Sequence, residues 1–301
     1  MTVVKPKRLE PGEKIGVIAP AGPVLQSELQ SGIDVLESSG FSVVISSHLY
    51  HVQDYLAGDD EARLQDLHDM FGNKKVKAII CARGGYGALR LLDKIDYELI
   101  RENPKIFVGY SDITALLLGI FKKTGLVTFH GPVVKDISKN SHQNLKSLFD
   151  MVCSKTKTGM DHSGGRALVP GKATGTLLGG NLSLICHLSG TPFMPSLQGA
   201  ILFIEERGEA LYRIDRMLTH LRLSGLLEGA AGIIAGQFED CGDPSAIDRL
   251  LANTFSGLNI PIFRGLPVGH GLVNLPLPIG LEATLDTDTT TLSITETCVA
   301  A

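Results

Sequence analysis

The segment 105–119 constrains the fold of this chain more than any other. It begins with an apolar run at 106–108, passes through a turn that contains Ser111 and Asp112, and continues into a second apolar run that ends at Gly119. The first run is typical of a buried strand and the second of a buried helix. A serine at such a corner is lifted clear of the sheet, and helix N–H groups point toward whatever its hydroxyl attacks. The segment therefore predicts an α/β fold with a candidate nucleophile at Ser111.

Strand-like and helix-like segments alternate along the first half of the chain. Between the expected strands, apolar residues at helical spacing predict helices at 29–40 and 62–71. Such alternation is typical of a parallel sheet with helices on both faces, with functional side chains at the carboxyl ends of the strands. The expected strands are 14–19, 41–45, 76–81, 106–109 and 126–129.

A change in composition and in hydrophobic periodicity divides the chain. The stretch 154–176 is rich in Lys, Gly, Ser and Thr and has no clear periodicity, which is typical of a linker. We therefore expect an N-terminal α/β domain at 1–155, a linker at 156–174 and a smaller C-terminal α/β domain at 175–301. In the second domain we expect helices near 181–188 and 212–223, strands at 199–204 and 232–236, and short β segments in the tail.

Composition and charge exclude several classes of protein. The net charge is −4 with no basic stripe, so neither nucleic acid nor a membrane surface is expected as a partner. No apolar run approaches the roughly 20 residues that cross a bilayer. The first 12 residues lack a hydrophobic signal core, so we expect a cytoplasmic protein. The five cysteines are scattered and never form C-x-x-C, so neither a disulfide framework nor a metal site is expected. No cofactor is expected either.

Ser111 requires help to act as a nucleophile. An unassisted hydroxyl reacts poorly at neutral pH and needs a neighbouring base. The G-x-S-x-G pattern of a nucleophile turn is incomplete, because Ile113 occupies the position of the second glycine. The alternative is that Ser111 caps the following helix, although Asp112 could also serve as that cap. Both interpretations remain open at this point.

A histidine and an acidic pair supply candidates for the base and its partner. His270 lies between two glycines, which leave an imidazole open to substrate, and its ordinary pKa suits a general base. The alternative is a histidine held by backbone hydrogen bonds in a tight turn. Glu205 and Glu206 follow the apolar run 201–204, and strand alternation points them to opposite faces, so only one can orient the imidazole. The alternative for this pair is two solvated charges at a strand end.

The glycine-rich stretch 83–87 follows an expected strand. Its glycines allow backbone N–H groups to approach a phosphate or an oxyanion closely. A nucleotide site is not favoured, because neither G-K-[ST] nor an early G-x-G-x-x-G is present. We expect an oxyanion hole made by the N–H groups of Gly85 and Asp112. Cys81 is disfavoured as a rival nucleophile, because it lies within the apolar strand.

Together these segments resemble the LD-carboxypeptidase family, the murein tetrapeptide carboxypeptidases, to which the microcin self-immunity peptidases are related. The resemblance covers nearly the whole chain in the right order. It rests on GEKIGVIAPAG at 12–22, RGGYG at 83–87, GYSD at 109–112, GTLLGGNL at 175–182, the block 205–216 and GHG at 269–271.

The resemblance implies a fold, an activity and a set of site residues. The expected fold is a flavodoxin- or amidotransferase-like parallel-sheet domain followed by an α/β domain with barrel-like β structure, in a cytoplasmic homodimer. Members cleave the amide between an L-centre, such as that of diaminopimelate, and a terminal D-alanine, which converts muropeptide tetrapeptides to tripeptides. The implied roles are Ser111 as nucleophile, His270 as base, Glu205 as the orienting acid, and Gly85 and Asp112 as oxyanion donors.

Further residues are expected to face the substrate. Asn181 and Arg207 match such positions in the family. A carboxypeptidase must also recognise a free carboxylate, for which Arg83 and Arg207 are candidates by position. Two other functions remain open. One is a microcin-immunity peptidase that hydrolyses a peptidyl or aminoacyl nucleotide, against which the absence of tryptophan argues, since that branch stacks an aromatic on the base. The other is a muropeptide-binding protein without catalysis.

Overall fold

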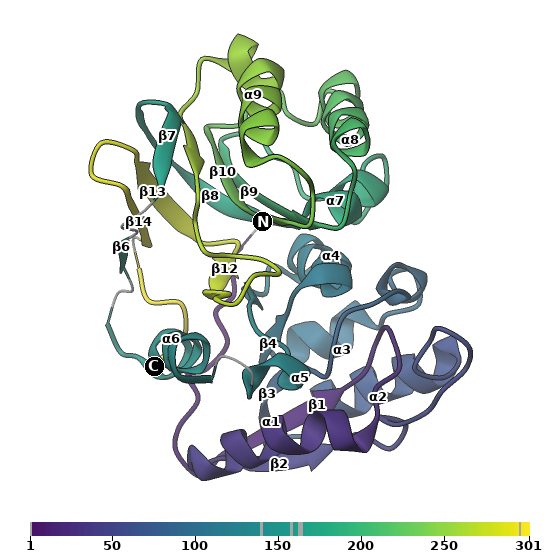
Figure 1. The fold of residues 1–301 in the computed structure, drawn as a ribbon. Coiled ribbons are helices and arrows are strands. Elements are labelled where there is room, and N and C mark those ends of the chain that lie inside the picture. The colour runs from purple at the N-terminus through teal and green to yellow at the C-terminus, as the bar shows by residue number, and fades with distance from the viewer. Residues whose placement is uncertain (1, 139–140, 157–158, 162–164, 295) are drawn as a thin grey trace.

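The structure is a computed structural model that describes residues 2–138, 141–156, 159–161, 165–294 and 296–301. Within these residues the strands form two sheets, which lie in separate halves of the molecule (Figure 1). The first sheet has the strand order β12-β5-β4-β3-β1-β2. Its strands are β1 (Lys14–Ile18), β2 (Ser42–Ile45), β3 (Val76–Cys81), β4 (Ile106–Gly109), β5 (Thr128–His130) and β12 (Leu277–Ile279).

Strands β1 to β5 run parallel to one another, as the alternating sequence pattern predicted. The order β2-β1-β3-β4-β5 is that of flavodoxin-like doubly wound sheets, which confirms the expected fold class. Every residue of β4 is buried, because helices cover both faces of a parallel sheet and both faces must then be apolar. The loops that follow β1, β3 and β4 therefore meet at one edge.

The second sheet has the order β6-β14-β13-β8-β9-β10-β11-β7, with β8 to β11 parallel and the outer strands antiparallel. Its parallel core corresponds to the strands expected in the second half. The strands are β6 (Gly159–Asp161), β7 (Arg166–Val169), β8 (Lys172–Asn181), β9 (Ala200–Arg207), β10 (Gly232–Glu239), β11 (Ile262–Arg264), β13 (Glu282–Asp286) and β14 (Thr291–Ile294).

Two segments depart from the domain division suggested by the sequence. Parts of 156–174, which we interpreted as a linker, form β6, β7 and the start of β8. Residues 157–158 and 162–164 of that segment lie outside the described residues. β7 is an edge strand whose residues are exposed or half-buried, so it lacks the apolar run that marks a buried strand. β12, from the second half, pairs antiparallel with β5 in the first sheet.

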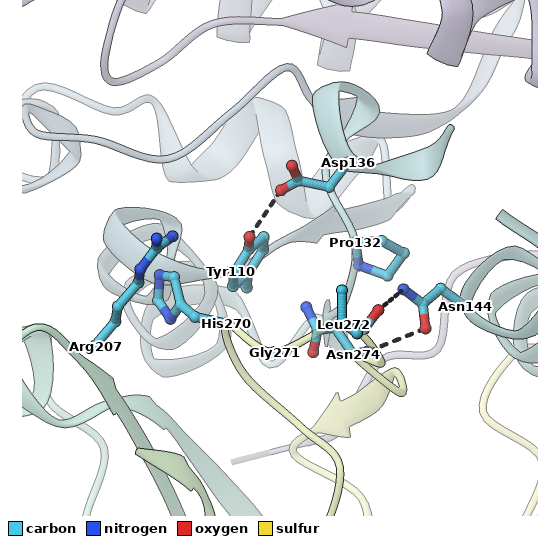
Figure 2. Close-up of a pocket in the computed structure, with 9 residues that line it drawn as sticks. All are labelled: Tyr110, Pro132, Asp136, Asn144, Arg207, His270, Gly271, Leu272 and Asn274. Atoms are coloured by element: carbon cyan, nitrogen blue, oxygen red, sulfur yellow. Dashed lines mark hydrogen bonds between the residues drawn. The ribbon is translucent and has the colours of Figure 1, made fainter. Parts of the chain in front are cut away.

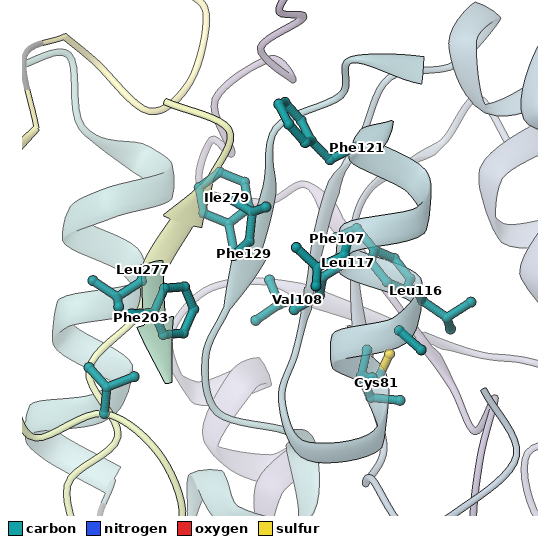
Figure 3. Packing of buried hydrophobic residues seen from close by; sticks show 14 of the residues in the cluster. Cys81, Phe107, Val108, Leu116, Leu117, Phe121, Phe129, Phe203, Leu277 and Ile279 are labelled. Carbon is teal, nitrogen blue, oxygen red and sulfur yellow. The ribbon is translucent and has the colours of Figure 1, made fainter. Parts of the chain in front are cut away.

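Helices cover the two sheets, and α4 lies where the halves meet, in contact with β4, β5, β8 and α7. Side chains from both sheets form one hydrophobic cluster, in which Phe129 of β5 and Phe203 of β9 are fully buried (Figure 3). The helices are α1 (Gln26–Ser38), α2 (Asp60–Gly72), α3 (Tyr97–Glu102), α4 (Thr114–Thr124), α5 (Val134–Ile137), α6 (Ser141–Cys153), α7 (Leu182–Leu188), α8 (Leu211–Leu223) and α9 (Pro244–Phe255), with short 3₁₀ turns η1 (Ala88–Leu91), η2 (Ser111–Ile113) and η3 (Ser256–Leu258).

None of the helices in the described ranges combines the length and the apolar character needed to cross a bilayer.

Candidate active site

Ser111 occupies a strained turn between β4 and α4. Its φ is +63°, in the left-handed region that residues with a Cβ rarely adopt. Gly109, two residues before Ser111, makes the turn possible, because a Cβ there would lie 2.6 Å from the Ile113 side chain. Ile113 is fully buried, so the residue that breaks the G-x-S-x-G pattern serves as an anchor below the corner. Strain of this kind is typical of a nucleophile turn rather than of an ordinary helix cap.

The glycine-rich loop 83–87 lies against this turn. A Cβ on Gly84 would lie 2.9 Å from Ser111 Cβ and 3.1 Å from its Oγ, so only glycine fits there. Gly85 has a φ of +120°, and within the described part of the chain its N–H has no acceptor. Asp112 lies in the first turn of η2, where N–H groups lack partners within a helix. Both expected oxyanion donors thus belong to segments that adjoin Ser111.

His270 and Glu205 are in direct contact, although 65 residues separate them. Nδ1 of His270 lies 2.6 Å from Oε2 of Glu205. The carboxylate is fully buried near the end of β9, whereas the imidazole retains 11% of its exposure. Gly269, with a φ of +127°, allows this approach, because a Cβ on it would lie 2.7 Å from Glu205 Oε2. A carboxylate in this position orients the ring and stabilises its protonated form.

Two opposing effects set the proton affinity of His270. Burial, the largest effect, lowers the pKa, whereas the hydrogen bond and the negative charge of Glu205 raise it. The net result is a pKa above the ordinary value of 6.5. The ring is therefore a stronger base than a free histidine, as a proton acceptor for a hydroxyl should be.

Glu206 points away from the histidine, as strand alternation requires. Its carboxylate accepts hydrogen bonds from Asn181 Nδ2 at 2.9 Å, from the Ser183 N–H at 2.9 Å and from the Ser183 hydroxyl at 2.7 Å. Asn181 also caps α7 through its side-chain oxygen, and it is buried. The structure thus places Asn181 in the support of β9, and its expected contact with substrate stays a prediction.

Tyr110 connects the serine turn to the histidine. Its ring centroid lies 4.9 Å from that of His270, and its hydroxyl donates to Asp136 Oδ2 at 2.7 Å. Among the described residues, no hydrogen bond joins Ser111 Oγ to His270. Such bonds are often long before substrate binds. The neighbour of the serine is therefore in contact with the imidazole, while the hydroxyl itself is not yet bonded to it.

A cavity of about 210 Å³ opens beside the imidazole (Figure 2). The loop that carries His270 is held by Asn274, whose Oδ1 accepts from the Gly269 N–H at 3.0 Å, and by Gln237, whose Oε1 accepts from the Gly271 N–H at 2.8 Å. The cavity is lined by Tyr110, Pro132, Asp136, Asn144, Arg207, His270, Gly271, Leu272 and Asn274.

The two candidate arginines occupy different places. Arg207 lines the cavity, beside His270 in Figure 2, and its side chain is 58% exposed, with Asp240 3.6 Å from its Nε. Arg83 is half-buried and donates from Nη1 to the Pro23 carbonyl at 3.0 Å. Of the two, Arg207 therefore has the side chain that can reach a ligand in this cavity.

Cys81, the other candidate nucleophile, is poorly placed for chemistry. Cys81 is fully buried, and burial raises the pKa of its thiol, so it does not form a thiolate readily. No group of three or more His, Cys, Asp or Glu side chains in the described ranges is placed to hold a metal ion.

The sequence pattern did not single out Tyr110, Asp136, Asn144, Gln237 or Asn274. Tyr110 lies next to Ser111 in the chain, and its position was the only local signal. The others come from α5, α6, β10 and the loop after β11, and only the fold brings them to the histidine loop.

Comparison with known proteins decides the family. The LD-carboxypeptidase N-terminal domain matches residues 15–131, and the LD-carboxypeptidase C-terminal domain matches residues 174–285. This chain belongs to the LD-carboxypeptidase family. It is an enzyme, a carboxypeptidase of the serine type.

Individual relatives are similar to this chain in sequence or in structure over almost its full length. A probable murein peptide carboxypeptidase of Bacillus subtilis is 41% identical over an alignment of 292 positions that covers 94% of this chain and 92% of that protein. The muramoyltetrapeptide carboxypeptidase of Oxalobacter formigenes has a similar structure, with a TM-score of 0.83, 33% identity and coverage of 93% of this chain and 98% of that one. The MccF-like protein of Bacillus anthracis has a TM-score of 0.90, 31% identity and coverage of 97% and 99%.

Proposed function

We propose that this enzyme releases the terminal D-alanine from murein tetrapeptides by cleaving the amide between an L-centre and D-alanine. The observation that carries the proposal is the buried Glu205–His270 pair at the edge of a polar cavity, next to the strained turn of Ser111. The names of the murein peptide relatives support the substrate class.

The proposed reaction is acyl transfer through Ser111. The hydroxyl attacks the scissile carbonyl while His270 accepts its proton, and Glu205 stabilises the imidazolium that forms. The N–H groups of Gly85 and Asp112 hold the negative oxygen of the tetrahedral intermediate, where losing one donor costs on the order of 3 kcal/mol. His270 then protonates the departing amine of D-alanine, and water hydrolyses the acyl-enzyme.

We further propose that Arg207 recognises the free carboxylate of the substrate, because it lines the cavity beside His270. A guanidinium is suited to a carboxylate through paired N–H donors. Replacement of Arg207 by alanine should raise the Michaelis constant for the acid substrate and leave that for the C-terminal amide nearly unchanged. Arg83→Ala is the parallel variant. If neither changes the preference for acid over amide, both arginines are excluded from this role.

The direct test is incubation with an L,D-tetrapeptide and with an all-L control, followed by mass spectrometry of the products. We expect loss of D-alanine from the first peptide only. Ser111→Ala should abolish turnover while the variant remains folded, as judged by circular dichroism. Undiminished release of D-alanine by this variant would end the assignment of Ser111 as nucleophile.

A second candidate function follows from the similarity to an MccF-like protein. A microcin-immunity peptidase would hydrolyse a peptidyl or aminoacyl nucleotide. The lack of tryptophan in this chain argues against it. Parallel assays with an aminoacyl sulfamoyl nucleotide and the tetrapeptide distinguish the two functions by the ratio of kcat/KM. A protein that cleaves neither substrate and resists a fluorophosphonate probe would be a binding protein without catalysis.

The proposal includes a homodimer that acts in the cytoplasm during peptidoglycan recycling, as the family resemblance implies. The dimer is tested by light scattering of the purified protein, where a monomer mass at micromolar concentration would contradict it.

A further inference from the structure

Arg63 is a buried arginine near the site that takes no part in the proposed reaction. It lies on α2, and its side chain has no exposed surface. Nη1 donates to the Pro20 carbonyl at 2.6 Å and to the Gly87 carbonyl at 3.0 Å, and Nη2 pairs with Asp60. Burying a charge costs free energy even when it is paired, so an arginine here needs a reason other than stability.

The two carbonyls that Arg63 holds belong to two loops of the site. Pro20 is in the loop after β1, and Gly87 ends the glycine-rich loop after β3. The loops are also joined directly, because the Gly22 N–H donates to the Gly84 carbonyl at 3.2 Å. Gly84 in turn leaves no room for a Cβ against Ser111. Arg63 thus fixes the far end of the loop whose middle carries the Gly85 N–H.

The nucleophile turn is joined to the same loop. Oδ2 of Asp112, the residue after Ser111, accepts from the Ala88 N–H at 2.8 Å. Arg63 and Asp112 also attract each other electrostatically. The residues 87–88 are therefore held from one side by Arg63 and from the other by the serine turn.

Asp60 keeps the guanidinium neutralised and in place. The Asp60 carboxylate also pairs with two side chains outside the loops. Arg90 Nε lies 2.8 Å from it and Lys94 Nζ lies 3.2 Å from it. The Arg90 hydrogen bond, with the help of Lys94 and Arg63, lowers the pKa of Asp60 to about 2. The carboxylate is therefore ionised throughout the working pH range, and it anchors Arg63 from α2.

We propose that Arg63 is a positioning residue for the oxyanion hole, which locks the loops 20–23 and 83–87 together so that the Gly85 N–H stays aimed beside Ser111. The inference rests on the proposed acyl-transfer function. It concerns the transition state, because the loop position determines how well the negative oxygen is held and not how well the peptide binds.

The test compares Arg63→Met, Arg63→Lys and the control Lys94→Met. Methionine fills the space without donating, and lysine can hold one carbonyl. Lys94 pairs with Asp60, and within the described residues it has no hydrogen bond to either loop. A misplaced catalytic donor typically costs about 10- to 100-fold in rate. We expect Arg63→Met to lower kcat by about that factor with KM within about twofold, Arg63→Lys to be intermediate, and Lys94→Met to match the unchanged enzyme.

A tetrahedral inhibitor separates positioning from a purely structural role. A peptide boronic acid that bonds to Ser111 should lose affinity in Arg63→Met by the same factor as kcat. Binding of the uncleaved tetrapeptide, measured in a Ser111→Ala background, should not change. Equal losses in both measurements, or a fall in kcat explained by the folded fraction, would overturn the inference.

A second variant guards against failure of Arg63→Met to fold. A Cβ on Gly87 would lie 2.6 Å from Arg63 Nη1 and 2.7 Å from Leu56 Cδ2, and the φ of Gly87 is +129°, so Gly87→Ala displaces the guanidinium without removing it and also strains the end of the loop. This variant should also lower kcat while leaving KM nearly unchanged. An unchanged kcat in this variant would contradict the proposal.

The proposed function and this inference fail in different ways. If the unchanged enzyme cleaves no tetrapeptide but its Ser111 reacts with a fluorophosphonate, the substrate assignment falls, and the labelling rates of the Arg63 variants still decide the inference. If Ser111 reacts with neither peptide nor probe, the nucleophile and the positioning role fall together.

Discussion

Ser111 is distinguished among the described serines by its backbone. Its φ of +63° costs about 1–3 kcal/mol for a residue with a Cβ. The conformation persists because its surroundings allow no other: Gly84 packs on the serine from one side, and Ile113 anchors the turn below Gly109. The same contacts place the hydroxyl at the start of η2, just before α4. The strain is therefore tied to the position that the proposed acyl transfer needs.

This strain predicts an unusual order of stability at position 111. Glycine adopts a positive φ without a clash, whereas alanine keeps the Cβ that causes the strain. We expect Ser111→Gly to unfold in urea with a free energy about 1 kcal/mol larger than that of Ser111→Ala. Both variants should be inactive. Equal stabilities would show that the turn is not strained.

The pH dependence of activity follows from the environment of His270. In the proposed reaction His270 is the base and must be neutral, and its pKa is above 6.5, so kcat/KM should fall as the pH drops through that raised value. In Glu205→Gln the charge that raises the pKa is gone while burial still lowers it. We therefore expect the acidic limb to move to lower pH, and kcat to fall by a factor on the order of 10³ to 10⁴. A pH–rate profile measures both.

Glu206→Gln is the matched control, because Glu206 is equally buried but bonds to Asn181 and Ser183 instead. Its acidic limb should stay within a few tenths of a pH unit of the unchanged enzyme. A shift in Glu206→Gln as large as that in Glu205→Gln would mean that the direct contact does not set the pKa.

Residues with local signals could be found from the sequence. Ser111 follows an apolar strand, and His270 stands between glycines, because both need a backbone that comes close to other groups. Arg63 and Asn274 carry no such signal. Arg63 looks like any arginine on an amphipathic helix, and only the approach of the loops after β1 and β3 gives it a role.

At the scale of elements, the C-terminal end of α2 is in contact with a lysine side chain from another segment. Lys105, just before β4, donates from Nζ to the carbonyls of Met70 at 2.9 Å and Val76 at 2.8 Å, and also to that of Asn73. These carbonyls lie at and beyond the C-terminal end of the helix, where carbonyls lack partners and a positive charge is favourable. The ammonium thus replaces a C-cap and joins α2 to the first sheet.

Replacement of this ammonium should destabilise the fold without changing the chemistry. Lys105→Met leaves buried carbonyls unpaired, and we expect the free energy of unfolding to fall by about 2 to 3 kcal/mol. The kcat of the folded fraction should be unchanged. Lys77→Met, at an exposed position on β3, is the control and should change stability by less than about 0.5 kcal/mol. A loss no larger than that of the control would contradict the capping role.

Elements with strong apolar patterns were predicted and weak ones were not. The continuous apolar runs of the buried strands β1, β3 and β4 predicted those strands directly, and the helical spacing of apolar residues predicted α8. β7 and β12 are short strands at sheet edges, and β12 is held by pairing with β5 from the other half of the chain. Such pairing depends on tertiary structure, which a local pattern does not contain.

At the scale of the whole molecule, each half supplies part of the site. Ser111 and the glycine-rich loop follow strands of the first sheet, and Glu205 lies on β9 of the second. His270 lies in the loop that leads from β11 of the second sheet to β12 of the first. Their relative position depends on the junction of α4 with β8, where the Asn181 N–H donates to Thr114 Oγ1 at 3.1 Å. The sequence predicted residues on each side but not this junction, because the hydrogen bond joins a backbone N–H to a threonine hydroxyl, and a local pattern does not show which partner such a group meets.

Gly180 packs closely against Thr114 at this junction. Its φ is +143°, and a Cβ there would lie 2.5 Å from both Thr114 Oγ1 and Thr114 Cγ2. Gly180→Ala therefore combines backbone strain with overpacking, and we expect it to lower the free energy of unfolding by about 2 to 4 kcal/mol. It should also lower the kcat of the folded enzyme at least about 10-fold, because β8 moves away from α4 and the glutamate–histidine pair moves with its sheet.

Gly190→Ala separates this displacement from backbone strain alone. Gly190 also has a positive φ, +80°, but no heavy atom lies within 4 Å of its Cβ position. We expect a cost of about 1 kcal/mol and no change in kcat. Urea denaturation and kinetics on both variants measure the difference. If the two alanine variants lost the same stability and kept the same kcat, the packing of Gly180 against Thr114 would not set the distance between the serine and the histidine, and the two halves would have to be aligned by other contacts.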